Sequence, residues 1–198
     1  MSKLIRALVT AAAMLAGSPA FAQDAQQPFT GARAEAVLGW DQVKFDLGGY
    51  GASGRSHDDS LGYGFEVGYD KAISPTLIGG FDAGMTFADN RATIGTAANG
   101  GLLRPRREVN AGVRLGTPLG ENALLYGKIG YSNLEVRRNL TVAGVTTSNL
   151  YDLDGVQLGA GAEVRVTPKV YLKSEYRYTD YAKDYNANQV MTGVGIRF

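Results

Sequence analysis

Eight segments of this sequence alternate between two kinds of residue, and every charged side chain in them falls on the same side of the alternation. In the last segment, residues 188–198, Val194 and Phe198 occupy one side, whereas Gly195 and Arg197 occupy the other. Successive side chains of a β-strand point to opposite faces, so this period of two predicts strands with two unlike faces. Either the charged or the uncharged faces must point inward, and both options describe an eight-stranded barrel.

The predicted strands are joined by connections of two lengths. The strands cover residues 32–41, 61–70, 77–87, 109–116, 125–132, 156–166, 171–178 and 188–198. Pro75, Pro118 and Pro168 each mark a short connection, because proline cannot donate to a strand ladder and belongs in turns. The longer loops are predicted over residues 42–60, 88–105, 133–153 and 179–187, and residues 134–145 could form an extra hairpin.

The charged faces together contain seven basic and seven acidic residues. The basic residues are Arg33, Arg114, Lys128, Arg165, Lys173, Arg177 and Arg197. The acidic residues are Glu35, Asp41, Glu66, Asp70, Asp82, Glu163 and Glu175. An eight-stranded barrel is just wide enough inside for side chains to fill it, and an unpaired charge there would be costly. We therefore predict that these residues, with Asp41 at a strand end set aside, form a balanced charge network that plugs the barrel interior.

The direction of the two faces separates a membrane barrel from a soluble one. With the uncharged faces outward, aromatic residues near strand ends, such as Trp40 and Tyr176, suit the two interfaces of a membrane. With those faces inward, the chain would be a soluble carrier barrel with many glycines at exposed strand positions, where they weaken a strand. We predict the first fold: an all-β, eight-stranded antiparallel up-and-down transmembrane β-barrel. Leu158 should then face lipid and tolerate no charge.

The first 22 residues have the composition of a secretory signal peptide. Lys3 and Arg6 precede an uncharged apolar stretch, and residues 20–22 form an Ala-Phe-Ala cleavage site. We expect cleavage after Ala22 and a barrel domain over residues 23–198. Loss of the two basic residues leaves 18 basic against 19 acidic side chains, a balance that gives no electrostatic reason for nucleic-acid binding. The chain has no cysteine, which excludes disulfides and thiolate metal sites.

Four motifs carry a resemblance to a known family. They are residues 62–69 (GYGFEVGY), 79–84 (GGFDAG), 126–131 (YGKIGY) and 193–198 (GVGIRF). In this order, the chain resembles the small outer-membrane β-barrel family, with OmpA-like transmembrane domains and opacity-type "porin family" proteins. The resemblance implies the outer membrane of a Gram-negative cell, contact with lipid and lipopolysaccharide, and a monomer. It also implies that the barrel-assembly machinery reads Val194, Ile196 and Phe198. The sequence stops at the barrel, so tethering to the cell wall is not implied.

Two loop motifs have residue types that can carry chemistry. His57 lies beside Asp58, Asp59 and Ser60, which are residue types of a general base site, but neighbours in a loop do not make a triad. The same acidic residues could bind a cation weakly, although they lack an EF-hand pattern. Arg104, Arg106 and Arg107 form a basic cluster that could contact lipopolysaccharide phosphates or could simply be a solvated rim.

These observations support four functional hypotheses. The first is a plugged integral barrel with a structural and surface-interaction role, whose loops over residues 42–60, 88–105 and 133–153 could contact a surface ligand. The second is a narrow porin-like channel for small solutes. The third is an outer-membrane enzyme that uses His57, and the fourth is a soluble periplasmic carrier. We favour the first, and under it we expect no enzymatic activity, catalytic residue, cofactor, metal or nucleic-acid partner.

Overall fold

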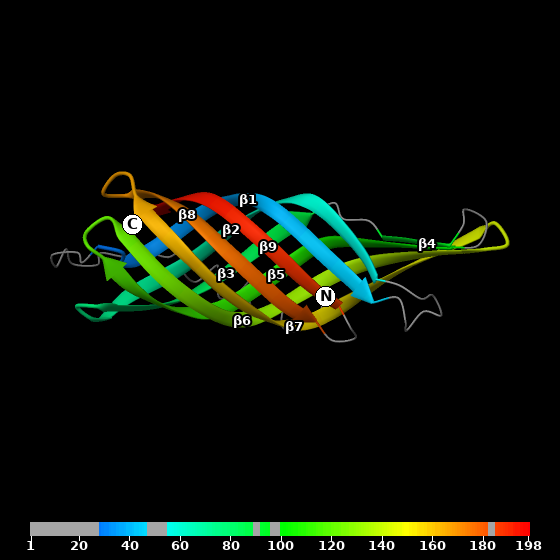
Figure 1. Cartoon of the computed structure of the whole chain (residues 1–198), viewed down its shortest axis with the longest axis horizontal. Helices are drawn as coiled ribbons and strands as arrows, with labels where there is room; N and C mark the ends of the chain where they lie inside the picture. Colours follow the sequence, from blue (N-terminus) through cyan, green and yellow to red (C-terminus); the bar gives the residue numbers. More distant parts are fainter. Residues whose placement is uncertain (1–27, 47–54, 89–91, 96–99, 182–184) are drawn as a thin grey trace.

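The computed structural model describes residues 28–46, 55–88, 92–95, 100–181 and 185–198, so the predicted signal peptide lies outside the described residues. The described residues form nine strands (Figure 1). They are β1 (Gly31–Asp46), β2 (Arg55–Ser74), β3 (Leu77–Ala88), β4 (Ala92–Gly95), β5 (Gly100–Leu119), β6 (Ala123–Val142), β7 (Val145–Arg165), β8 (Val170–Tyr181) and β9 (Tyr185–Arg197). The described part of the chain holds no helix with the length and apolarity that a membrane span requires.

Eight of these strands form a closed ring. Neighbouring strands of the ring pair antiparallel. β3 pairs directly with β5, which leaves out the short strand β4, and β1 pairs with β9 to close the ring. β4 lies outside the ring and continues the sheet on the edge of β5. The predicted fold, an eight-stranded antiparallel up-and-down barrel, is therefore confirmed.

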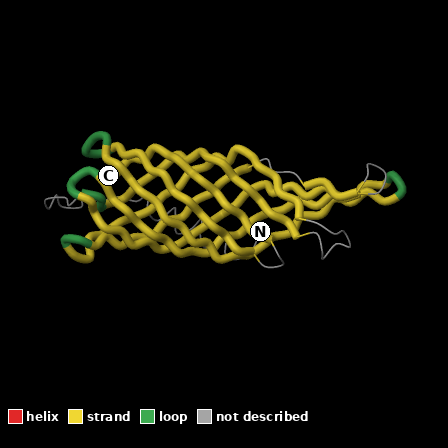
Figure 2. The backbone as a smooth tube through the Cα atoms, in the orientation of Figure 1, coloured by secondary structure: helices red, strands yellow, loops and turns green. Residues whose placement is uncertain are grey.

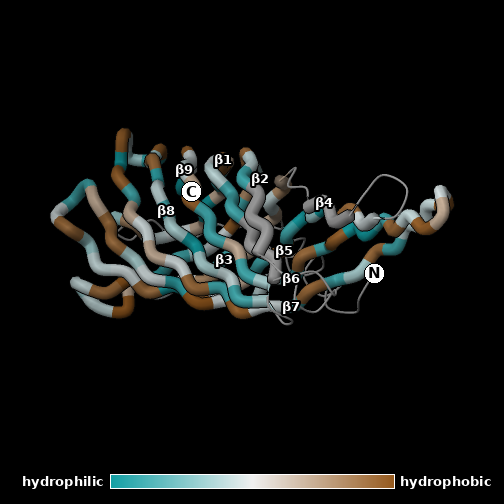
Figure 3. The backbone as a smooth tube through the Cα atoms, turned by 45° about the vertical axis from the view of Figure 1, so that its right-hand side comes forward, coloured by the Kyte–Doolittle hydropathy of each residue, from teal (hydrophilic) through white to brown (hydrophobic). Residues whose placement is uncertain are grey.

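The uncharged faces of all eight ring strands point outward. Leu38, Val113 and Leu158 are 56%, 58% and 50% exposed, whereas Arg33 and Glu66 from the alternating faces are buried. Figure 3 shows the resulting alternation of apolar and polar residues along the strands. An outer surface made of large apolar side chains is suited to lipid and contradicts the alternative of a soluble carrier with an apolar interior.

The two rims of the barrel differ in their connections. One end, here called the short-turn rim, carries the turns at residues 75–76, 120–122 and 166–169, and the C-terminus lies at the same end (Figures 1 and 2). The opposite end, the hairpin rim, carries the connection between β6 and β7. Its two central residues, Ala143 and Gly144, both have positive φ, which is the signature of a type I′ turn.

The hairpin rim corrects the predicted loops. Most of residues 133–153 is strand, because β6 and β7 remain paired up to Val142 and Val145. Residues 42–60 and 88–105 are also shorter as loops than predicted, since β1 and β2 pair to Asp46 and Arg55 and β5 begins at Gly100. The prediction relied on a regular alternation of apolar and polar residues. Because backbone pairing continues here without that regular alternation, the prediction ended these strands too early. The strands therefore project beyond the ring as an extension (Figure 2).

Candidate functional site

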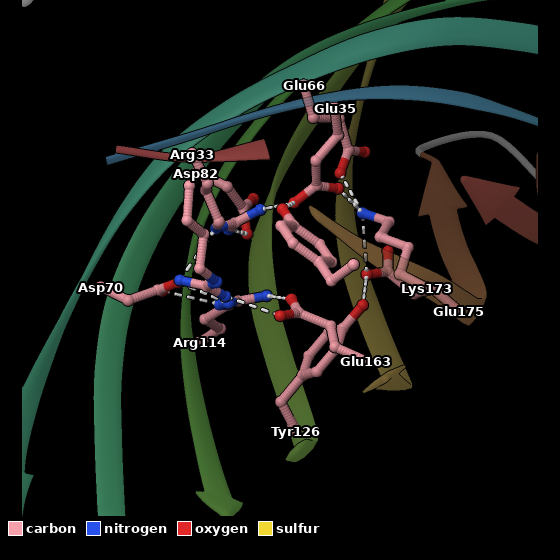
Figure 4. Close-up of polar contacts among 12 residues, drawn as sticks. Arg33, Glu35, Glu66, Asp70, Asp82, Arg114, Tyr126, Glu163, Lys173 and Glu175 are labelled. Atoms are coloured by element: carbon pink, nitrogen blue, oxygen red, sulfur yellow. Dashed lines mark hydrogen bonds and ion pairs between the residues drawn. The ribbon is translucent and has the colours of Figure 1, made fainter. Parts of the chain in front are cut away.

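The interior near the short-turn rim is filled by an ion cluster in which three arginines share two carboxylates. Arg114 contacts Asp70 and Glu163, each at 2.6 Å. Arg197 reaches the same two carboxylates at 2.7 and 2.6 Å, and Arg33 lies 3.2 Å from Asp70. The five residues come from β1, β2, β5, β7 and β9, so the cluster connects five of the eight ring strands. Figure 4 labels its members Arg33, Asp70, Arg114 and Glu163.

A second ion cluster continues the network toward the centre of the barrel. Lys173 lies 2.5 Å from Glu66 and 3.7 Å from Glu175. Arg177 contacts both of these carboxylates, and Lys128 lies 3.1 Å from Glu175. All five side chains are buried away from water. The ion pairs among them therefore have to compensate their charges.

Two residues join the clusters. Glu35 contacts Arg33 of the first cluster and Lys173 of the second. Asp82 lies 3.2 Å from Arg33 and 3.5 Å from Lys128. The interior charges therefore form one continuous network from the short-turn rim to the middle of the barrel.

Two tyrosines complete the packing of this network. The hydroxyl of Tyr126 donates to Glu175 at 2.5 Å, and the hydroxyl of Tyr171 donates to Glu35 at 2.7 Å. The ring of Tyr171 lies against Gly195, where an added Cβ would be 2.3 Å from Cζ of the ring. A larger residue than glycine would displace the ring, so the interior glycine provides the space for an aromatic side chain.

The half of the interior nearer the hairpin rim is also polar, but there amide and hydroxyl groups contact the carboxylate of Glu108. Glu108 accepts hydrogen bonds from Ser132 at 2.8 Å and from Gln157 and Gln189, each at 2.7 Å. The same nitrogen of Gln189 also donates to Asp41 at 2.7 Å. Within the described residues, Glu108 has amide and hydroxyl partners rather than a basic one.

A cluster of buried, mostly apolar side chains lies toward each end of the interior. Toward the hairpin rim, a cluster of buried side chains lies beyond the layer of Glu108, and it consists of Leu103, Leu134, Val136, Leu153, Tyr181, Tyr185 and Ala187. At the short-turn rim, Phe29, Ile78, Leu124 and Tyr126 form the second cluster. A cavity of about 20 Å³, close to the space one water molecule needs, lies where Glu108 and Gln189 meet Leu134 of the hairpin-rim cluster, and residues 105–107 of β5 also line it.

Twelve of the thirteen residues predicted for the network are buried inside the barrel, and one is not. Arg165 lies at the short-turn rim, where its Nη1 donates to the backbone carbonyl of Glu121 at 3.0 Å. Arg165 ends β7, and its guanidinium carbon lies 5.9 Å from the centroid of the Phe29 ring at the same rim. Glu108 is an interior residue that the sequence analysis missed, because the predicted strand began one residue later. Extending that alternation by one position would have found it.

The interior is not balanced as predicted. Among the described residues, six basic and eight acidic side chains are buried, because Arg165 is at the rim and Glu108 is inside. The two carboxylates nearest the hairpin rim, Asp41 and Glu108, account for the difference. Both accept a hydrogen bond from the side-chain nitrogen of Gln189, which compensates part of their buried charge.

The remaining predicted site residues lie outside the interior. Val194, Ile196 and Phe198 point outward from the end of the chain and are 49%, 42% and 65% exposed. The backbone of His57 belongs to β2 and pairs with Lys44, but its side chain lies outside the described part of the structure. The described residues contain no group of three or more potential metal-ligating His, Asp or Glu side chains.

Comparison with known proteins agrees with this architecture. The family described as "Outer membrane protein beta-barrel domain" matches residues 8–198. The outer membrane protein A of Escherichia coli O157:H7 is 27% identical over 184 residues, which cover 89% of this chain and 48% of that protein. This chain thus spans about half the length of that relative.

Two solved structures share the fold. Neisserial surface protein A has a TM-score of 0.56 at 16% identity, covering 85% of this chain and 98% of that structure. Ail of Yersinia pestis has a TM-score of 0.53 at 17% identity, covering 86% of this chain and all of that structure. Because the family match covers almost the entire chain, this protein belongs to the outer-membrane β-barrel family of Gram-negative bacteria and is located in the outer membrane.

Proposed function

We propose that this protein is a non-conducting, non-catalytic barrel that serves the outer membrane as a structural and surface-interaction protein. The continuous ion network between two apolar clusters carries this proposal. A hydrated ion would have to break buried ion pairs to cross the interior, and this step is unfavourable. The strand extension at the hairpin rim offers backbone and side chains for contact outside the cell, since longer connections of such barrels face outward.

We expect the purified protein to show no stable stepwise conductance in single-channel recordings across planar lipid bilayers. The physical reason is the network of buried ion pairs, such as Arg114–Asp70 and Lys173–Glu66, which an ion would have to break to cross the barrel. Heat-modifiable migration on gels and flotation with vesicles would establish that the protein is folded and inserted in the same preparation. Reproducible current steps from inserted wild-type protein would favour the narrow-channel alternative.

The proposal includes no catalytic step. The relatives found are named as outer-membrane proteins, which supports a role without catalysis. A hydrolytic or acyl-transfer activity on lipid A that disappeared in His57→Ala would contradict this part of the proposal.

Assembly in the cell is proposed to depend on the outward row Val194, Ile196 and Phe198. We expect Phe198→Ala to reduce the amount of protein in isolated outer membranes several-fold, while the purified variant refolds in detergent like the wild type. The side chain of Phe198 is largely exposed, so its loss should matter more for recognition than for packing. The matched control is Val166→Ala, an exposed apolar residue at the same rim. Equal outer-membrane levels of the wild type and the Phe198 variant would argue against an assembly signal at this residue.

A further inference from the structure

A β-bulge in β5 places a run of arginines on the outside of the barrel near the hairpin rim. The register between β5 and β6 shifts between Pro105 and Arg107, so Arg106 is an extra residue in the ladder. Pro105 and Glu108 are buried, whereas Arg106 is exposed. Without the bulge, strict alternation from Glu108 would turn Arg106 and Arg104 inward. With it, Arg104, Arg106 and Arg107 share the outer surface.

The position of these arginines corresponds to the surface of the membrane. Arg107 pairs in register with Phe87, and the ring of Phe87 packs against Tyr63 with centroids 5.7 Å apart. Outward aromatic residues at a strand end mark the headgroup level of an outer-membrane barrel. Arg104 pairs with Arg137 and Arg107 with Glu135, so Arg104 lies two ladder positions further toward the hairpin rim, about 7 Å along the strand. The arginines therefore extend from the aromatic level into the headgroup region.

The charges of this cluster are only partly compensated by the protein. Arg106 and Arg107 share one carboxylate, Glu135, at 3.4 and 3.1 Å. Arg104 lies directly opposite Arg137 on β6, and like charges at paired positions destabilise a sheet. In the part of the chain that the structure describes, neither of these two arginines has an ion pair, and Nε of Arg104 is buried without a hydrogen-bond partner.

The unpaired arginines surround a cavity. Its volume is about 210 Å³, and its described lining consists of Ala88, Arg104, Pro105, Arg106 and Arg137. No carboxylate contributes to this described lining, and Asp152, which lies opposite Glu135 on β7, is outside it. Guanidinium groups bind phosphate oxygens through two parallel hydrogen bonds, a geometry that an ammonium group cannot match.

We propose that Arg104, Arg106 and Arg137 form a binding site for a phosphate group at the outer surface of the membrane. A phosphorylated lipid headgroup and free phosphate share this chemistry, and the height of the cavity makes a headgroup the natural source. The site would anchor the barrel to the surrounding leaflet. This inference rests on the proposed surface-interaction role and gives that role a ligand class.

The test compares the wild type with Arg104→Gln/Arg137→Gln, which removes two charges and keeps side chains of polar character. Binding of bisphosphorylated lipid A to the detergent-solubilised protein would be measured by native mass spectrometry, with dephosphorylated lipid A as the second probe. Inorganic phosphate would be tested alone, through the shift in thermal unfolding relative to chloride at the same ionic strength. We expect the double variant to bind bisphosphorylated lipid A at least about tenfold more weakly, the equivalent of one charge-assisted hydrogen bond.

The control is Lys71→Gln/Lys169→Gln, which removes two exposed charges at the short-turn rim and should bind lipid A like the wild type. A shift with inorganic phosphate that is lost only in the arginine variant would identify free phosphate as the source. Equal lipid A and phosphate binding by all three proteins would overturn the inference. Arg137→Gln alone provides the comparison if the double variant does not fold. Because insertion into vesicles is scored separately by gel migration, failure of this site would leave the proposed function standing.

Discussion

Replacement of Arg177 by methionine should lower the free energy of unfolding by about 3–5 kcal/mol, the range for removing one partner of a buried ion pair. The Arg177 side chain is completely buried and contacts both Glu66 and Glu175. Methionine fills most of the volume but leaves an additional uncompensated negative charge among interior carboxylates that already outnumber the cations. Urea titration of the protein in phosphatidylcholine vesicles, followed through the fluorescence of the single tryptophan, Trp40, would measure the change.

Two further variants make this result specific to the network. Lys169→Met removes a basic side chain from the exposed turn at the short-turn rim, and its effect should stay within about 0.5 kcal/mol. Arg177→Met/Glu66→Gln removes a positive and a negative charge together, so it should be more stable than Arg177→Met alone. If Arg177→Met unfolded at the same urea concentration as the wild type, the interior would be hydrated rather than closed by ion pairs.

Introduction of arginine at Val113 should cost about 2–4 kcal/mol, the range for a basic side chain on the lipid face near the bilayer midplane. Val113 lies on the outer face of β5, midway between Val109 and Thr117, and it pairs with Phe81 and Ile129 on the neighbouring strands. Its surroundings are therefore apolar side chains and acyl chains, where a guanidinium group finds no compensating partner. The same urea titration in vesicles would measure the loss of stability.

A second outward position and an exposed turn test the assignment of the lipid face. Leu158→Arg should also cost about 2–4 kcal/mol, because Leu158 faces outward on β7 and pairs with Ile129, the residue that also pairs with Val113. Asn122→Arg adds the same side chain to an exposed turn and should change stability by less than about 0.5 kcal/mol. Equal costs at all three positions would contradict a membrane on the outer face of the barrel.

The strands and their faces were predictable because the alternation is a local property. Each predicted face, such as that of Leu158, points where the charge pattern placed it, and one charged face per strand is enough to orient a closed sheet. The strand ends were not predictable by the same reasoning. Beyond the membrane band, β6 and β7 pair through polar and apolar residues alike, so their length depends on backbone hydrogen bonds that leave no period in the sequence.

The ion pairs inside the barrel could not be predicted from local sequence patterns. Lys173 meets Glu66 across 107 residues of chain, and which carboxylate meets which cation depends on the stagger of eight strands around the ring. The bulge at Arg106 changes the face of every residue on its far side, and Arg165 turns to the rim because of its position at a strand end.

A period of two with charge confined to one side was therefore sufficient for the architecture and for its location in a membrane, because those follow from which face meets lipid. The partners of the interior charges, the apolar clusters toward both ends and the outward turn of Arg104 and Arg106 arose from the closed ring. They depend on register and bulges, which bring together residues that have no relation along the chain.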